Sequence, residues 1–181
     1  MERHRLVLSG AGGQGVITAA IILAESAVLY ENMNAVQSQS YGAEARGGAT
    51  RSDVIISDAE IFFPKVNQPN TLVCLTQAAY NSYATLIRPG GLLVTDSRYV
   101  RVEKKVDARQ AALPLHQEVM EKIGKPVVYN ICMLGALIRL TNLVSSASVL
   151  KVLETRVPPK TLEMNRYALE LGMALASSVA G

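Results

Sequence analysis

The first part of the chain sets short apolar runs against turn residues and one long apolar segment. Residues 6–8 are three large aliphatic side chains, typical of a short buried strand, and a glycine-rich turn follows at once. Residues 16–29 are mostly strong helix formers that are apolar on nearly every side, which predicts a helix buried on more than one face. Strand, glycine turn and helix in this order are the opening of a Rossmann-like unit.

The middle of the chain is dominated by strands. Short aliphatic runs predict strands over residues 35–36, 53–57, 72–75 and 92–95. A helix is predicted over 78–86, and it ends before the Pro-Gly-Gly that follows Arg88. Residues 57–61 suggest a hairpin, residues 100–106 suggest pairing at a sheet edge, and the polar stretch 37–51 is typical of a loop.

After residue 114 the pattern becomes largely helical. It predicts helices over residues 115–123, 130–143, 147–154 and 161–178. Alternating strands and helices argue for a mostly parallel sheet covered on both faces. The chain has no internal repeat, no low-complexity tract and no long linker, so residues 1–181 are expected to form one domain. The predicted fold class is α/β: a Rossmann-like three-layer domain with a helix-rich C-terminal part.

Composition narrows the classes of function. A formal net charge of +3, without a basic helix, argues against nucleic acid as a partner. Cys74 and Cys132 lie far apart in apolar runs and no Cys-x-x-Cys occurs, so we expect buried thiols and no metal or iron–sulfur site in this chain. His4 and His116 lack partners at motif spacing and are expected at the surface or as helix caps. With no signal-peptide pattern, and with the longest apolar helix broken by Glu25, we expect a cytoplasmic protein outside the membrane.

The turn after the first strand has a candidate binding role. Its relevant residues are Gly10, Gly12, Gly13, Gln14 and Gly15. Glycines at this place allow positive φ angles, and the free N–H groups of a helix start suit a phosphate. The spacing also matches the dinucleotide fingerprint. An NAD site, however, needs an acidic residue at the end of the second strand to bind the ribose, and residues 35–38 contain none. Glu31 is the nearest acid, and it comes before the strand. A cofactor phosphate and a purely structural tight turn both stay open, and the polar Gln14 is a candidate ligand or subunit contact.

A second unusual element is the polar loop that precedes the strand at 53–57. Its candidate binding residues are Tyr41, Glu44, Arg46, Gly47 and Arg51. Long structured loops in compact domains usually have a function. The guanidinium forks of Arg46 and Arg51 suit a phosphate or carboxylate, and Tyr41 suits a stacked base. The alternative is a solvated loop in which Glu44 pairs with an arginine.

Together, these two elements resemble a known family. Gly-Ala-Gly-Gly-Gln-Gly-Val at 10–16 and Ser-Tyr-Gly-Ala-Glu-Ala-Arg-Gly-Gly at 40–48 are similar to the gamma subunit of CoA-dependent 2-oxoacid:ferredoxin oxidoreductases. Weaker similarities follow at residues 69–73, 89–91, 130–135 and 165–172. Ala43 departs from the family pattern, which often has proline there, so the loop is expected to be less rigid in this chain.

The resemblance implies a complex that converts a 2-oxoacid, CoA and oxidised ferredoxin to acyl-CoA, CO2 and reduced ferredoxin. Thiamine diphosphate, Mg²⁺ and 4Fe–4S clusters would be held by alpha, beta and delta-type partner subunits, and this chain has no Gly-Asp-Gly thiamine motif. By the same resemblance, Gly12 to Gly15 would form one wall of a CoA- and thiamine-facing site. The loop with Tyr41, Glu44, Arg46 and Gly47 would face that wall. No catalytic residue is expected in this chain, and the spelling of residues 37–41 favours 2-oxoglutarate as the 2-oxoacid.

Two other functions are compatible with the residues alone. The match of Gly10, Gly12 and Gly15 to the dinucleotide fingerprint would fit a free-standing NAD(P)-binding oxidoreductase. Alternatively, both loops would make protein contacts only, in a structural assembly module. Surfaces built for partners often pair with each other, so a homodimer of the isolated chain is also an expectation.

Overall fold

The computed structural model describes residues 3–40, 48–103 and 106–179, and these form a sheet between helices. Its strands are β1 (His4–Gly10), β2 (Asn34–Ser40), β3 (Thr50–Ser57), β4 (Thr71–Cys74), β5 (Gly91–Asp96) and β6 (Ala108–Leu113). Their order across the six-stranded sheet of the described residues is β2-β3-β1-β4-β5-β6. The pairs β1–β4, β4–β5 and β5–β6 are parallel, whereas β3 is antiparallel to both β1 and β2. Every strand except β3 therefore runs in one direction, and the predicted mostly parallel sheet is confirmed.

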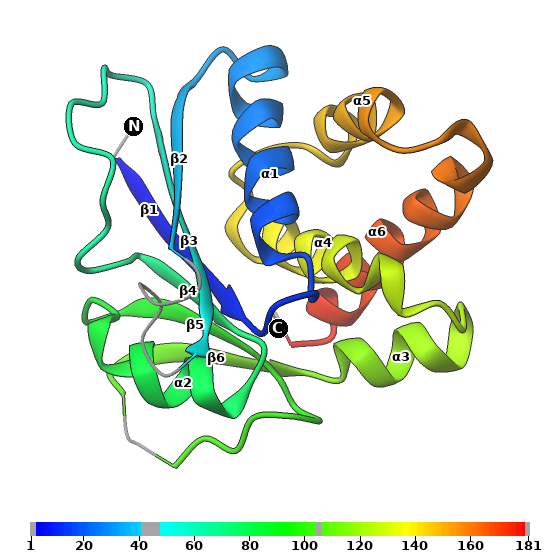
Figure 1. The fold of residues 1–181 in the computed structure, drawn as a ribbon. Helices are drawn as coiled ribbons and strands as arrows, with labels where there is room; N and C mark the ends of the chain where they lie inside the picture. Colours follow the sequence, from blue (N-terminus) through cyan, green and yellow to red (C-terminus); the bar gives the residue numbers. More distant parts are fainter. Residues whose placement is uncertain (1–2, 41–47, 104–105, 180–181) are drawn as a thin grey trace.

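Helices cover the two faces of the sheet unequally (Figure 1). One face carries α1 (Val16–Tyr30), α3 (Leu115–Lys122), α4 (Tyr129–Thr141), α5 (Ser146–Arg156) and α6 (Leu162–Ser177). The other carries α2 (Gln77–Tyr83) and the segment 58–70. Short 3₁₀ turns, η3 (Ala84–Leu86), η4 (Pro126–Val128) and η5 (Pro159–Thr161), extend α2 and precede α4 and α6. The predicted three-layer arrangement with a helix-rich C-terminal part is confirmed.

Alternation along β1 explains the two layers. Leu6 and Leu8 face the α1 side, where they pack with the large helical core, while Val7 faces the α2 side. All three side chains are fully buried, as expected for a central strand covered on both faces.

The helices α4 and α6 pack closely because glycines lie at their crossing. A Cβ at Gly172 would lie 1.8 Å from the carbonyl oxygen of Cys132, and one at Gly135 would lie 2.1 Å from that of Leu169. Neither position has room for a side chain, so the two glycines allow the helix backbones to touch.

Three local predictions were wrong. The stretch 37–40, expected as a loop, extends β2, and its polar side chains are tolerated because β2 is an edge strand. No hairpin follows β3, because β1 and β2 already occupy both of its sides. Residues 100–103 form no strand, and β6 takes the place beside β5 instead.

Candidate functional site

The carboxyl ends of β1 and β4 define the place where a doubly wound sheet binds ligands. The chain leaves β1 into α1 on one face and leaves β4 into α2 on the other, so the strand order reverses between these two neighbours. Ligands of such folds bind in the crevice outside this reversal point. The glycine loop at residues 10–15 forms the α1 side of that crevice.

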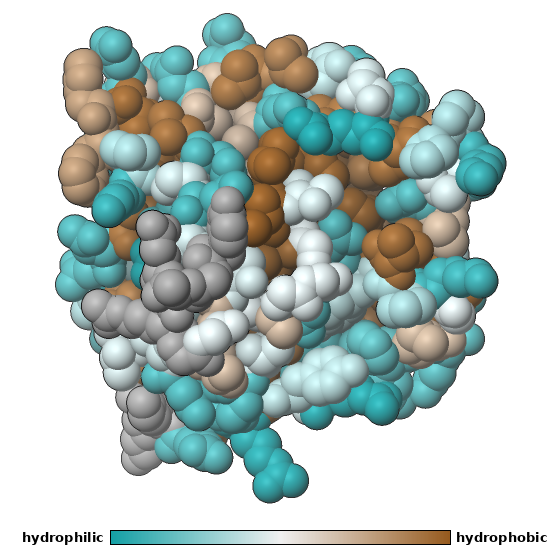
Figure 2. All heavy atoms as spheres, in the orientation of Figure 1, coloured by the Kyte–Doolittle hydropathy of each residue, from teal (hydrophilic) through white to brown (hydrophobic). Residues whose placement is uncertain are grey.

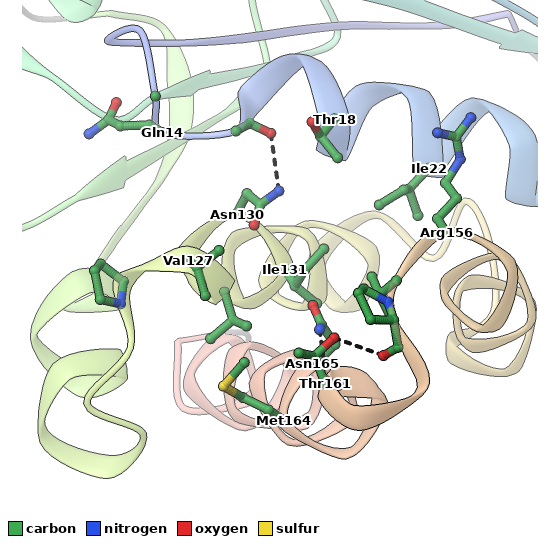
Figure 3. A pocket seen from close by; sticks show the side chains of 16 residues that line it. Gln14, Thr18, Ile22, Val127, Asn130, Ile131, Arg156, Thr161, Met164 and Asn165 are labelled. Carbon is green, nitrogen blue, oxygen red and sulfur yellow. Dashed lines mark hydrogen bonds between the residues drawn. The ribbon is translucent and has the colours of Figure 1, made fainter.

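Within the loop, Gly15 is held by a residue far away in the sequence. Gly15 is the N-cap of α1 with a φ of 75°, in the left-handed region where a side chain is strained. The amide of Asn130, near the start of α4, donates a hydrogen bond of 3.3 Å to its carbonyl oxygen (Figure 3). A Cβ at Gly15 would lie 2.6 Å from that amide nitrogen. Asn130 therefore fixes the loop and demands a glycine opposite it.

The turn itself is closed by Gln14. Its side-chain oxygen accepts a 2.7 Å hydrogen bond from the backbone N–H of Ala11, and this oxygen also occupies the space that a Cβ at Gly10 would need. Gly12 and Gly13 are exposed, and a Cβ at either would meet open space. The structure therefore assigns Gly10 and Gln14 to the turn, and it leaves the backbone of Gly12 and Gly13 accessible to a ligand.

The start of α1 is suited to an anion. In the described part of the chain, no side chain caps this helix and no acidic residue lies in its first turn. The unpaired N–H groups and the helix dipole give this end a partial positive charge.

A cavity of about 510 Å³ opens beside the loop (Figure 3). It lies between α1, η4, α4 and the η5–α6 corner, and its walls include Gly13, Thr18, Asn130, Met164 and Asn165. Arg156 also lines it, but its guanidinium pairs with Glu25 of α1. This ion pair lowers the pKa of the Glu25 carboxyl, mainly through the hydrogen bond from Arg156. The cavity is therefore mostly lined by apolar and amide groups.

The residues that flank the polar loop lie at the same edge of the sheet as the glycine loop. Thr50, after the loop, is the register partner of Gly10, and Ser40, before the loop, is the partner of Arg51 on the far side of β3. The predicted site residues Tyr41, Glu44, Arg46 and Gly47 lie outside the described residues.

Arg51, the fifth candidate of that loop, is held by a side chain that the sequence analysis missed. Its guanidinium donates to both oxygens of Asp53, at 2.6 and 3.0 Å, and to the carbonyl oxygen of Val66. It also lies 5.3 Å from the ring centre of Tyr83. The signal was present, because residues two apart in a strand share a face. Arg51 thus joins β3 to the segment 58–70 and lines a polar cavity of about 490 Å³.

A buried carboxylate at the end of β5 was also missed. Asp96 is fully buried and accepts hydrogen bonds from the backbone of Arg98 and His116 and from the hydroxyl of Tyr129, at 2.7 to 2.9 Å. Burial, followed by the charge of Asp96, raises the pKa of Tyr129. The His116 ring lies edge-on to Tyr99 and Tyr129, and its Nδ1 has no hydrogen-bond partner among the described residues. Asp96 therefore ties the start of α3 and α4 to the sheet.

The remaining candidates take structural places. Cys74 and Cys132 are buried on opposite faces of the sheet, and desolvation raises the pKa of each thiol to about 12. Glu31 accepts hydrogen bonds from Ser145 and Ser148 at the start of α5, and the one from the Ser145 backbone is the main reason why its pKa is lowered. Glu31 is thus engaged away from the carboxyl edge, where a ribose-binding acid would be needed.

Comparisons with known proteins agree with one another. A family model described as pyruvate ferredoxin/flavodoxin oxidoreductase matches residues 5–175. A protein of Methanocaldococcus jannaschii named 2-oxoglutarate synthase subunit KorC is 47% identical over 179 residues, which cover 98% of this chain and 96% of that protein. The protein of the same name from Methanothermobacter marburgensis is 40% identical over 179 residues, which cover 96% of this chain and 96% of that protein.

Solved structures show the same fold. A keto/oxoacid ferredoxin oxidoreductase gamma subunit from Geobacter sulfurreducens is 39% identical with a TM-score of 0.87, covering 97% of this chain and 99% of that one. A 2-oxoglutarate:ferredoxin oxidoreductase from Magnetococcus marinus, solved with 2-oxoglutarate, coenzyme A and succinyl-CoA bound, has a TM-score of 0.88. At 22% identity, and with 32% of that longer chain covered, the likeness to the Magnetococcus protein concerns the fold alone.

The sheet and its glycine loop define a Rossmann-like α/β domain in which the N-terminus of α1 is suited to bind an anion. The chain belongs to the pyruvate ferredoxin/flavodoxin oxidoreductase family. Within it, the predicted assignment to the gamma subunits of 2-oxoacid:ferredoxin oxidoreductases is confirmed. No helix in the described ranges is both long and apolar enough to cross a membrane.

Proposed function

We propose that this chain acts in a complex that converts 2-oxoglutarate, CoA and oxidised ferredoxin to succinyl-CoA, CO2 and reduced ferredoxin. The names of its relatives from Methanocaldococcus and Methanothermobacter support 2-oxoglutarate as the 2-oxoacid. Thiamine diphosphate, Mg²⁺ and 4Fe–4S clusters would belong to alpha, beta and delta-type subunits. The part of the chain that the structure describes has no group of three or more His, Cys, Asp or Glu side chains that could hold a metal ion.

The observation that carries the proposal for the site is the pairing of Gly10 with Thr50, which brings the start of β3, just after the polar loop, next to the glycine loop. The accessible backbone of Gly12 and Gly13, with the uncapped start of α1, offers N–H groups and positive potential to the phosphates of CoA. Because β3, which follows the polar loop, starts beside Gly10, the proposal gives Arg46 the role of adding a charged fork to the same site. In this proposal the chain binds and orients CoA and carries no catalytic residue.

Reconstitution tests the proposed function. We expect the isolated chain to be inactive, and the chain co-expressed with its three partner subunits to support ferredoxin reduction that depends on 2-oxoglutarate and CoA. Pyruvate and 2-ketoisovalerate serve as competing substrates. An active complex that forms without this chain, or a preference for another 2-oxoacid, would refute the corresponding part of the proposal.

Two substitutions separate ligand binding from assembly. Arg46→Ala is expected to raise the KM for CoA about tenfold or more with assembly intact, because a charged fork is lost from the ligand. Gln14→Ala opens the turn, so it is expected to affect the folding of the loop as well as CoA binding. If Arg46→Ala abolishes assembly and leaves the KM of any surviving complex unchanged, the loop makes protein contacts only.

A further inference from the structure

The two phenylalanines of the chain are consecutive in the sequence, and both are exposed to solvent. Phe62 is 82% exposed and Phe63 is 59% exposed, although most large apolar side chains of the described residues are buried. They belong to the segment 58–70, which leaves β3 and crosses the α2 side of the sheet towards β4. Figure 1 draws this segment at the left margin, and Figure 2 shows hydrophobic atoms projecting there among hydrophilic ones. Exposed aromatic pairs of this kind are typical of protein interfaces.

The backbone that carries these side chains is fixed on both sides. Before them, the guanidinium of Arg3 donates to the carbonyl oxygen of Glu60 at 2.9 Å. After them, Ser38 donates to the carbonyl oxygen of Pro64 at 3.1 Å, and the N–H of Val66 donates to Asp53 at 2.8 Å. The phenylalanines are therefore presented by a pre-organised segment, which reduces the entropy lost when a partner binds.

Cationic side chains lie on the Phe63 side of the pair. A cavity of about 740 Å³ next to Phe63 is lined by Arg5, Lys65 and Arg88, and no aspartate or glutamate is among its described lining residues. The acidic residues of the segment, Asp58 and Glu60, precede the phenylalanines and do not line this cavity. The surface thus complements a partner that brings carboxylates together with apolar side chains.

We propose that Phe62, Phe63, Arg5 and Lys65 form a docking surface, called here the aromatic–cationic surface, for an acidic segment of another subunit in the complex. The partner's apolar side chains would cover the phenylalanine rings, and its carboxylates would meet Arg5 and Lys65. This inference rests on the proposed function, since it takes its partner from that complex. The aromatic–cationic surface lies on the side of the sheet opposite α1, so it is separate from the 510 Å³ cavity beside the glycine loop.

Interface variants test the surface in the co-expressed complex. Phe62→Ser with Phe63→Ser, and separately Arg5→Glu with Lys65→Glu, are expected to weaken subunit binding at least tenfold. Tyr167→Ser and Lys160→Glu are matched controls, because both residues are exposed on the C-terminal helices, and they should leave binding unchanged. Binding is measured by sedimentation, and thermal unfolding of the isolated variants checks that each one folds.

Zero-length crosslinking identifies the partner that binds the aromatic–cationic surface. It uses the wild-type complex, so no substitution can disturb the fold. A carbodiimide is expected to join the Lys65 amine to an aspartate or glutamate of another subunit, and Lys65→Arg removes this crosslink while keeping the charge. A crosslink from Lys65 to a second copy of this chain, or unchanged binding by both double variants, would overturn the inference. If the wild-type chain forms no complex with any of the partner subunits, the proposed function itself is wrong. If the complex forms but the double variants bind as well as the wild type, only the docking surface is wrong.

Discussion

Gly15 shows at the scale of one residue how the glycine loop depends on a distant part of the chain. Its φ of 75° and the 2.6 Å between a would-be Cβ and the Asn130 amide are two separate obstacles to any side chain. We predict that Gly15→Ala lowers the free energy of unfolding by about 1–3 kcal/mol, as expected for a strained left-handed residue with a close contact. Chemical denaturation measures the change.

Gly12→Ala is the matched control for this prediction. Its Cβ would meet nothing within 4 Å and its φ is not positive, so its stability should change little. Adding Asn130→Ala to Gly15→Ala should restore only part of the lost stability, because the Asn130 Cβ, 2.9 Å from the added Cβ, and the strained φ both remain. A full recovery of stability would contradict both causes.

The cysteines give a second prediction at this scale. Because desolvation raises the pKa of both the Cys74 and the Cys132 thiol to about 12, neither should form thiolate at neutral pH in the folded chain. We expect no reaction of the native protein with a disulfide reagent and reaction of both thiols after denaturation. Rapid labelling of either thiol in the native state would contradict their burial.

At the scale of elements, the close crossing of α4 and α6 at Gly172 can be tested. An alanine at this position has two effects of opposite sign on stability. Replacing glycine by alanine inside a helix stabilises it by about 1 kcal/mol through propensity alone. The contact of 1.8 Å with the Cys132 carbonyl predicts instead that Gly172→Ala forces α4 and α6 apart, costing about 1–3 kcal/mol. Thermal unfolding decides the sign, with Glu170→Ala on the exposed side of α6 as the control.

The link between α1 and α5 predicts a pH dependence. Hydrogen bonds from Ser145 and Ser148 lower the pKa of Glu31 in the folded chain. A carboxyl with a lowered folded pKa stabilises the fold above its unfolded pKa of about 4.3, and this contribution is lost as pH falls through the folded value. Glu31→Gln should therefore be less stable than the wild type at neutral pH, and the difference should shrink as the pH falls below the unfolded pKa of the Glu31 carboxyl. An unchanged difference across this range would contradict the role of the Glu31 charge.

Elements with a strong pattern were predictable, and those set by their neighbours were not. The central strands and α1 follow from aliphatic runs and the glycine turn. The polar end of β2 was missed because only its position as an edge strand makes Gln37 to Ser40 acceptable there. The small and polar residues of β6 likewise carry little strand signal.

The same contrast holds for the candidate site. The glycines were predictable because a turn between strand and helix requires them. The contact between Asn130 and Gly15 was not, because it spans 115 positions of the sequence and exists only after α1 and α4 have packed. Asp53 and Asp96 left weaker signals in the sequence. Asp53 shares a strand face with Arg51, and Asp96 ends a buried strand. Their hydrogen-bond partners become known only from the fold.

Across the whole molecule, the strand order argues against the dinucleotide function that the glycine spacing allows. In the Rossmann arrangement the second strand lies next to the first, so its terminal acid can reach a ribose bound at the glycine loop. Here the antiparallel β3 lies between β1 and β2, which moves the end of β2 away from β1 by two strand spacings, about 10 Å. The end of β2 also carries no acid, and Glu31 is engaged at α5.

We therefore predict that the isolated chain does not bind NAD or NADP at micromolar concentrations, even though its glycine loop and helix start are intact. Isothermal titration of the folded chain measures this, with a known NAD-dependent dehydrogenase as the positive control. Micromolar binding of either nucleotide would mean that the loop recognises a dinucleotide without the ribose contact, and the anion-ready start of α1 would then have to be assigned to a different ligand from CoA. Because the obstacle lies in the strand order, a Ser38→Asp variant that supplies an acid on β2 should not gain NAD binding.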